Sequence, residues 1–485
     1  MNDYYLWNSR ASFYDINGTL HFNLPKNIIS ISNYLCNDAF KFASEVRYNY
    51  GSELLSVNWN NIIRPNLISY LTLSYSNYHV IKDNINNAFM QSRIESGIRY
   101  TGLKYRIKYT GIQHHTIDGG INLVNYFVHP GERTPLDTGS LIIPASLKNE
   151  KAYEGAIFLN DEYEVNNYLI FNTGLRISGY QKAGSGMIFG FEPRLSTRIK
   201  INDRSSVKMS YNRDLQYISM ISLSLISTPG DIWKLANSNI KPLIANQFAL
   251  GYYRNFINNT IETSVEAYYK SISNIIEYKD GAVLEMNPDL ENELLNANGI
   301  NYGIEFSLKR NSGKIDGWIS YTYSRSLRKV TDHDQGKIIS NNNYFPSSYD
   351  KPHDFTIVAN WHANRRLQFS ANFTYSTGIP ITLPEYKYST SGEIMVVFSR
   401  RNEYRIPDYH RLDLTVSLDE SLRIKKKWKG YWSFSLLNVY GRKNPYSVYY
   451  KKEDPGEYNN FNRFNLYKLY LIGKPMPILN YSFVF

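Results

Sequence analysis

The sequence has almost no cysteine. Cys36 is the only one among 485 residues, so an intrachain disulfide and a cysteine-based metal site are both excluded. No segment approaches the roughly 18 consecutive apolar residues that a membrane-spanning helix needs. The first residues also lack the basic and apolar regions of a signal peptide. Two or three soluble domains, or one large β architecture, are still compatible with this length.

What the chain does have is tyrosine. Its 43 tyrosines bring the aromatic content to 15%, and together with a low alanine content this favours strands over helices. The net charge is +11, but Lys and Arg are scattered rather than clustered. The densest basic stretch, 423–430, is typical of a turn. A nucleic-acid partner is therefore not expected.

Apolar and polar residues alternate along much of the chain. The segments 300–309, 367–376 and 411–418 each place apolar residues on one face and polar residues on the other. Strict alternation of this kind predicts half-apolar strands. A transmembrane barrel consists of such strands, and its average hydropathy does not reveal it.

The connections between these strands alternate between short and long. The short ones include 23–27, 63–66, 165–167, 202–205, 310–313, 362–366 and 425–430, and the long ones are 116–152, 217–244, 272–299, 325–353, 376–408 and 451–463. Outer-membrane barrels have tight turns on the periplasmic side and extended loops outside. We therefore predict an all-β fold, a transmembrane antiparallel β-barrel in the Gram-negative outer membrane, surrounded by its lipids.

About 19 strands can be counted. The first of them, 11–22, and the last strand would both run inward, which leaves an antiparallel ring unclosed. Three further strands would give a barrel of the 22-stranded type, wide enough to need a plug. Together with the missing signal peptide, this predicts that residues 1–485 are one barrel domain that is truncated at its N-terminus.

The chain ends in "ILNYSFVF". Tyr481, Phe483 and Phe485 share one face of an extended segment. An aromatic end at the inner membrane interface fits the closing strand of a barrel, because aromatic girdles lie at both interfaces.

Several segments resemble TonB-dependent outer-membrane receptors, in particular those with a carboxypeptidase-regulatory-like domain ahead of the plug. They are "GWISYTYSRSLR" (317–328), "SSYDKPHDFTIVANW" (347–361), "YSTGIPITLP" (375–384), "YRIPDYHRLDLTVSL" (404–418) and "WSFSLLNVYGRKNPYSVYY" (432–450). The resemblance implies energised uptake of a bulky nutrient: a siderophore, glycan or peptide. It also implies that Phe485 is the signal read by the barrel assembly machinery, and it allows for a surface lipoprotein partner.

The family's signal peptide, TonB-contacting box and plug are not found in the sequence. The resemblance therefore implies a receptor barrel that is inactive alone, with the TonB complex as partner only if a plug is supplied. Two other hypotheses stay open. One is a passive porin-like or adhesive outer-membrane barrel, and the other is a soluble all-β binding or hydrolytic protein.

Ligand-binding residues are expected in the long loops. The first candidates are Tyr126, Phe127 and Arg133, and the second are Trp233 and Lys234. Aromatic rings beside polar groups suit stacking on sugars or flat ligands, or holding a peptide. Packing within the loops themselves explains the same residues equally well.

No catalytic or metal site is predicted, and no cofactor is implied. His410 and Asp413 have opposite parity in a strand, so they point to opposite faces, and Asp408 precedes the strand. His114 and His115 also point apart, at what we expect to be the outer end of a strand, whereas a metal needs three or four convergent ligands. The glycine-rich segment 179–190 is expected to be a hairpin tip.

Overall fold

The computed structural model describes residues 2–3, 9–42, 46–85, 87–222, 230–332, 339–390, 393–420, 429–453, 463–470 and 472–484. These residues are mostly strand, with three short 3₁₀ turns: η1 (Ala88–Met90), η2 (Leu290–Glu293) and η3 (Ser340–Asn342). None of the described helical turns has the length and apolarity that a membrane crossing requires.

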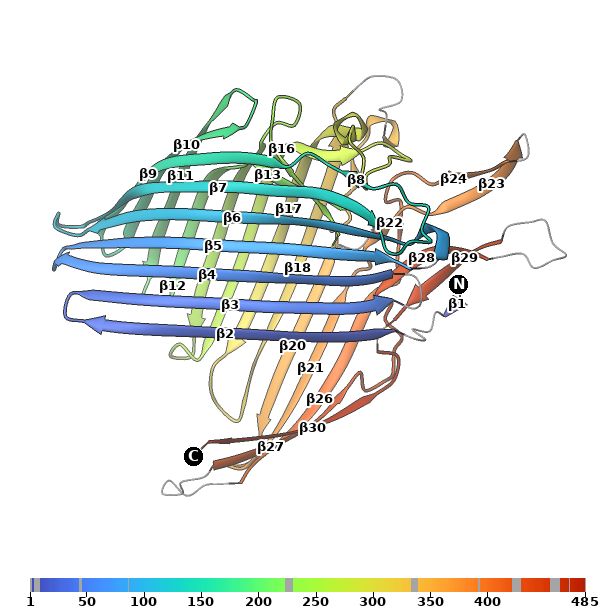
Figure 1. Ribbon diagram of the computed structural model, residues 1–485. Helices are drawn as coiled ribbons and strands as arrows, with labels where there is room; N and C mark the ends of the chain where they lie inside the picture. Colours follow the sequence, from blue (N-terminus) through green and yellow to red (C-terminus); the bar gives the residue numbers. More distant parts are fainter. Residues whose placement is uncertain are drawn as a thin grey trace.

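Nineteen long strands form the wall, counted over the described ranges, which agrees with the predicted number (Figure 1). They are β2 (Arg10–Leu24), β3 (Asn27–Phe42), β4 (Val46–Arg64), β5 (Leu67–Asn84), β6 (Ser92–Tyr109), β7 (His115–Pro135), β9 (Glu150–Asn166), β10 (Leu169–Lys182), β11 (Met187–Asn202), β12 (Ser205–Gln216), β15 (Leu243–Phe256), β16 (Ile261–Tyr278), β17 (Leu294–Arg310), β18 (Ile315–Val330), β20 (His353–His362), β21 (Leu367–Ser376), β26 (Tyr409–Asp419), β27 (Lys429–Leu437) and β30 (Met476–Val484). Each pairs antiparallel with the next in this order, and the sheet curls into a barrel.

The remaining strands are short and lie in the connections. They are β1 (Asn2–Asp3), β8 (Ala145–Ser146), β13 (Ile218–Ile221), β14 (Ile232–Leu235), β19 (Phe345–Pro346), β22 (Pro380–Ile381), β23 (Pro384–Thr390), β24 (Glu393–Phe398), β25 (Tyr404–Arg405), β28 (Ser447–Glu453) and β29 (Arg463–Leu469). β13 and β14 pair as a hairpin between β12 and β15.

Short and long connections lie at opposite rims of the wall. We call them the short-connection rim, with turns such as 25–26, 65–66 and 203–204, and the long-connection rim, with 136–149, 217–242, 279–293, 331–352, 377–408 and 438–475. The predicted segregation is confirmed, but not every connection at the second rim is long. β3 ends at Phe42 and β4 starts at Val46, and only 183–186 separate β10 from β11.

The boundaries of one predicted loop, 116–152, were wrong. β7 continues to Pro135, so Tyr126, Phe127 and Arg133 lie in a strand rather than a loop. Opposite β7 the register shifts between Glu95 and Gly97 of β6. A bulge of this kind lets a strand continue through residues that would otherwise end it.

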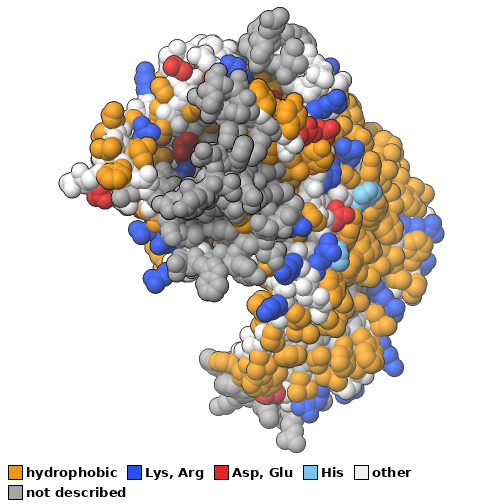
Figure 2. Space-filling model, turned by 90° about the vertical axis from the view of Figure 1, so that its right-hand side faces the viewer, with side chains coloured by type: hydrophobic (Ala, Val, Ile, Leu, Met, Phe, Trp, Pro, Cys, Tyr) orange, Lys and Arg blue, Asp and Glu red, His pale blue; other side chains and the backbone are white. Residues whose placement is uncertain are grey.

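The two faces of the wall differ as the alternation predicted. On β15, Phe248 and Leu250 point outward and are 57% and 50% exposed, whereas Glu262, Glu266 and Lys270 of β16 share the inner face. Figure 2, which views the long-connection rim, shows hydrophobic side chains covering the outer surface. Apolar side chains outside and polar side chains inside are the arrangement of a membrane barrel.

The buried core lies inside the barrel, at the long-connection rim. Clusters of buried apolar side chains form where the long connections fold against the inward-facing side of the strands. One cluster contains Val128, Tyr180 and Leu235, and another contains Leu295 and Val330. Packing is therefore concentrated at the end of the barrel where the connections are long.

The ends of the sheet are not paired with each other. β2 pairs along its length with β3, and β30 with β27, but no pairing joins the described residues of β2 and β30. Both strands run from the long-connection rim to the short-connection rim (Figure 1). Because β2 and β30 run in the same direction, they cannot pair antiparallel with each other. An antiparallel sheet that joined them would need an odd number of further strands between them.

The aromatic end of the chain lies at the short-connection rim. The rings of Trp432 and Tyr481 are 4.4 Å apart, and Phe483 follows at 6.1 Å from Tyr481. Glu420 accepts hydrogen bonds from both Trp432 and Tyr481. Phe485, the predicted assembly signal, lies outside the described residues.

Candidate ligand-binding rim

Hairpin β13–β14 folds inward and packs against the inner wall of the barrel. Leu235 is fully buried in a cluster with Val128, Ala152 and Tyr180, and Trp233 packs at the edge of this cluster. Tyr126 of β7 packs against the same cluster. Tyr126, from the first group of residues predicted to bind ligand, is therefore brought together with Trp233 from the second, although the two lie far apart in the sequence.

An ion-pair cluster, which we call the anchor, fixes the hairpin. It consists of Glu150, Lys182, Lys234 and Glu291. Glu150, which is 8% exposed, lies 2.6 Å from Lys234 Nζ and 3.0 Å from Lys182 Nζ, and it also accepts a hydrogen bond from the Leu235 N–H at 3.2 Å. Lys234 further pairs with Glu291 at 3.0 Å. The anchor thus joins β9, β10, the hairpin and η2.

The pKa shifts in the anchor reflect its pairing. Burial acts to lower the pKa of Lys234, but hydrogen bonds and attraction from Glu150 and Glu291 outweigh it, so the pKa is raised. Burial acts to raise the pKa of Glu291, but hydrogen bonds from Asn239, Lys234 and Asn237 bring it down to about 2. Both groups are held in their charged forms.

A second polar network lies on the inner wall, next to the anchor. Tyr126 donates a hydrogen bond to Glu154 at 3.0 Å, and Arg176 binds the other oxygen of Glu154 at 2.7 Å. Arg176 also contacts Glu192 at 3.3 Å, and Glu192 accepts a hydrogen bond from Ser178 at 2.8 Å. Such a satisfied network makes the inner surface rigid and polar.

Two stacked tyrosines connect this network to the hairpin. The rings of Tyr180 and Tyr217 are 4.5 Å apart and almost parallel, and Tyr180 donates a hydrogen bond to the carbonyl of Ala236 at 3.0 Å. Sequence reasoning missed Tyr180, Tyr217, Glu150 and Glu291. The residues that contact these four side chains come from distant parts of the chain, so no local sequence pattern indicated their role.

The other predicted binding residues lie elsewhere. Phe127 is on the outer face of β7, between the cations Arg99 and Lys151. Arg133 is near the end of β7, and its Nε is buried without a hydrogen-bond partner. The structure therefore separates Phe127 and Arg133 from Tyr126, Trp233 and Lys234.

A second feature of this rim is a hollow of about 770 Å³ on the inner side of β20, β21 and β26. Tyr349 and Tyr446 line it and are 60% and 52% exposed. Ser376, which is 6% exposed, also lines it, and its hydroxyl has no hydrogen-bond partner. Arg411 contributes a cation. Exposed rings beside an unpaired donor suit a polar ligand.

The residues considered for catalysis have separate partners. Asp408 accepts hydrogen bonds from Tyr375 and the Gly378 N–H, His410 contacts the hydroxyl of Tyr440 at 2.7 Å, and Asp413 pairs with Arg411 at 2.8 Å. The three side chains therefore take part in different contacts of the described structure.

The histidine pair lies at the other rim from the one predicted. His115 begins β7 at the short-connection rim, where it contacts Asp161 at 2.8 Å and stacks on Tyr163. Reading 116–152 as one outer loop caused this error. Among the residues that the structure describes, no group of three or more His, Cys, Asp or Glu could hold a metal ion.

We expect docking of the hairpin to weaken only at acid pH. The folded pKa of Glu291, about 2, lies below its ordinary value of 4.5. Its stabilisation is therefore fully present above pH 4.5 and is lost as the pH falls towards 2. Fluorescence anisotropy of a label at Ser238→Cys, in a Cys36→Ser background, measures docking. Glu291→Gln should remove the acid step, and an unchanged step in that variant would contradict the assignment.

The fold and the polar inner face define a transmembrane β-barrel in which a hairpin of the long-connection rim folds into the lumen. The family model for "TonB dependent receptor-like, beta-barrel" matches residues 2–441. The chain therefore belongs to this family of receptors and transporters. Its location is the outer membrane of the Gram-negative type, as the sequence predicted.

Solved receptors share the fold. The ferripyoverdine receptor of the outer membrane of Pseudomonas aeruginosa has a TM-score of 0.65 and 12% identity, over 98% of this chain and 65% of the receptor. The ferric preacinetobactin receptor BauA from Acinetobacter baumannii has a TM-score of 0.65 and 11% identity, over 99% and 73%. FpvAI in its complex with pyocin S2 has a TM-score of 0.64 and 12% identity, over 91% and 63%. A comparison with curated proteins found no match.

The chain thus spans slightly less than two thirds of the length of FpvAI and of the ferripyoverdine receptor. At these identities the likeness concerns the fold, because one fold hosts many functions.

Proposed function

We propose that this chain forms the transmembrane wall of a receptor for energised uptake of a bulky nutrient of the siderophore, glycan or peptide type. Membership of the receptor family supports the proposal. The observation that carries it is the long-connection rim, where hairpin β13–β14 is anchored inside the wall and the hollow beside Tyr349 and Tyr446 faces the lumen.

Ligand capture falls to this rim. The exposed rings of Tyr349 and Tyr446 offer stacking surfaces, and the unpaired hydroxyl of Ser376 offers a hydrogen bond. We assign the inner polar network the role of facing a plug, through which the TonB complex would act. The barrel assembly machinery and a surface lipoprotein are the other proposed partners.

Uptake measurements in cells test the proposal. Cells that produce the protein together with a plug domain are given labelled ferric siderophores, oligosaccharides or peptides, with the inner-membrane energising complex either present or deleted. We expect uptake of one class that disappears on deletion, and weaker binding of that class by the Tyr349→Ala, Tyr446→Ala double variant.

The same cells distinguish the alternative function. Uptake that survives the deletion and rises in proportion to solute concentration would identify a passive porin-like barrel. Adhesion to a surface without uptake of any of the three classes would identify an adhesive barrel. Either result contradicts the energised receptor.

A further inference from the structure

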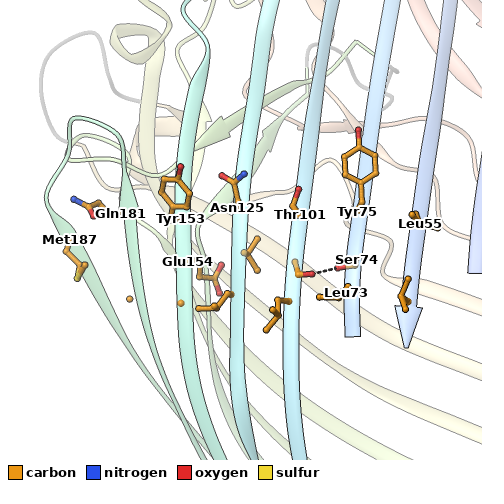
Figure 3. Close-up of a pocket in the computed structure, with 17 residues that line it drawn as sticks. Leu55, Leu73, Ser74, Tyr75, Thr101, Asn125, Tyr153, Glu154, Gln181 and Met187 are labelled. Carbon is orange, nitrogen blue, oxygen red and sulfur yellow. Dashed lines mark hydrogen bonds between the residues drawn. The ribbon is translucent and has the colours of Figure 1, made fainter. Parts of the chain in front are cut away.

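A hollow of about 850 Å³ lies on the outer face of the wall, across β4 to β11. Figure 3 shows Leu73 and Tyr75 of β5, Tyr153 of β9 and Met187 of β11 around it. Gly155 and Gly179 create the space, because the neighbouring strands carry side chains at the same level. This face contacts lipid, so the hollow is a place for a hydrocarbon chain rather than for the transported nutrient.

The residues above the hollow change in character towards the long-connection rim. The hollow itself has an apolar row with Leu103 and Leu123. The next row contains Thr101, Asn125 and Tyr153, which are adjacent in the ladder and form a band in Figure 3. The row above that consists of Arg99, Phe127 and Lys151. This order, from apolar through amide and aromatic to cationic, is that of a membrane interface.

The uppermost row, which we call the cation row, concentrates positive charge. Arg99 lies 5.5 Å and Lys151 lies 5.6 Å from the centre of the Phe127 ring. Both cations are exposed. Within the described part of the chain, neither side chain is ion-paired with a carboxylate or makes a hydrogen bond. The Phe127 ring thus lies between two cations that both contact it, and the hydrogen-bond donors of these cations are available to an anion.

The spacing between the hollow and the cation row fits one molecule. Leu123 and Phe127 are four residues apart on β7, which corresponds to about 13 Å along a strand. A lipid whose first acyl carbons enter the hollow would place its headgroup at the cation row. The long-connection rim lies on the outer side of the membrane, so the lipid belongs to the outer leaflet.

We propose that Arg99, Phe127 and Lys151 form, with the hollow below them, a binding site for a phosphorylated lipid of the outer leaflet. Arg99 and Lys151 bind the phosphate from the two sides of the Phe127 ring, and an acyl chain lies over Gly155 and Gly179. The site is independent of the nutrient pathway, because it is on the opposite face of the wall.

Native mass spectrometry of the purified protein tests the site. The probes are lipid A with two phosphates, the same lipid after phosphatase treatment, and inorganic phosphate. We expect the phosphorylated lipid to be retained preferentially, and the Arg99→Ala, Lys151→Ala double variant to bind it at least about tenfold more weakly, since two charge-assisted contacts are lost.

Arg254→Ala is the matched control. Arg254 also lies on the ring of an outward-facing residue, with its Cζ 4.8 Å from the Phe256 ring centre, but it is at the short-connection rim. We expect this variant to bind the lipid as the wild type does. An equal loss in Arg254→Ala, unchanged binding in the double variant, or equal retention of both lipids would overturn the proposal. Competition by inorganic phosphate at the lipid's own concentration would identify a phosphate site instead, and would also overturn it.

Gly179→Leu tests the acyl-chain part separately. A Cβ at Gly179 would have only ordinary contacts, the nearest being Phe189 at 3.7 Å, so the strand can accept the substitution. We expect weaker retention of the phosphorylated lipid although the cation row is intact. Full retention would show that the hollow is not part of the site.

Discussion

Replacing Glu150 with alanine is expected to release hairpin β13–β14 from the inner wall. The substitution leaves Lys182 and Lys234, whose side chains are 12% and 13% exposed, without their shared carboxylate. It also leaves the N–H of Leu235 without its acceptor. Removing one partner of a buried ion pair costs about 3–5 kcal/mol, and here the cost falls on docking of the hairpin.

Hydrogen exchange over residues 230–242, together with anisotropy of a label at Ser238→Cys, measures this release. Asp203→Ala is the matched control, because Asp203 pairs with Lys200 at 2.8 Å, which lies between the two Glu150–lysine distances of 2.6 and 3.0 Å, but is 95% exposed. Exposed pairs contribute little, so the control should leave exchange unchanged. If Glu150→Ala protects the hairpin as well as the wild type does, the anchor is not what holds it.

Replacing Asp350 with alanine should disorder two connections at once. The Asp350 side chain is fully buried and pairs with Arg325 at 3.3 Å and with Arg405. It also accepts a hydrogen bond from the Ser326 N–H at 2.6 Å. Because β18, connection 346–352 and the segment before β26 all meet at this carboxylate, its loss leaves Arg325, Arg405 and the Ser326 N–H without the acceptor that they share. We expect a local cost of about 3–5 kcal/mol.

Limited proteolysis of the folded barrel detects the loss of order as new cleavage within 346–352 and 404–408. Asp350→Asn should show a smaller effect, because an amide oxygen can still accept the hydrogen bond from Ser326. Lys351→Ala, at the exposed neighbouring position, should resemble the wild type. Equal cleavage in Asp350→Ala and Lys351→Ala would disprove the role of the buried carboxylate.

The wall could be predicted from the sequence because its rules are local. Alternation in 367–376 places Phe369 and Phe373 on the lipid face whatever the rest of the chain does, and short turns such as 203–204 separate one strand from the next. Nineteen strands and two unlike rims follow from such patterns. Prediction failed at 116–135, since Pro130 and Gly131 resemble a loop, whereas a bulge carries β7 past them.

The candidate site was only partly predictable, because it depends on contacts between distant segments. Trp233 and Tyr126 were identified from their type, but nothing in the local sequence shows that they would share one cluster. Glu150 and Glu291 are ordinary carboxylates until the fold brings Lys234 between them. Phe127 follows Tyr126 directly, yet it points to lipid, because neighbouring residues in a strand face opposite sides.

The meander connectivity also bears on how the wall assembles. Every ladder of the wall joins two wall strands that follow each other along the chain. Each hairpin can therefore pair with the preceding one, and no segment has to pass through a loop. The entropy lost on closing a loop grows with its length. Between β2 and β12 the longest connection that has to be closed is 136–149. The longer connections 217–242, 331–352, 377–408 and 438–475 all come later in the chain. The first half should therefore form quickly as a curved template, and docking of the later strands, β30 last, should set the pace of folding.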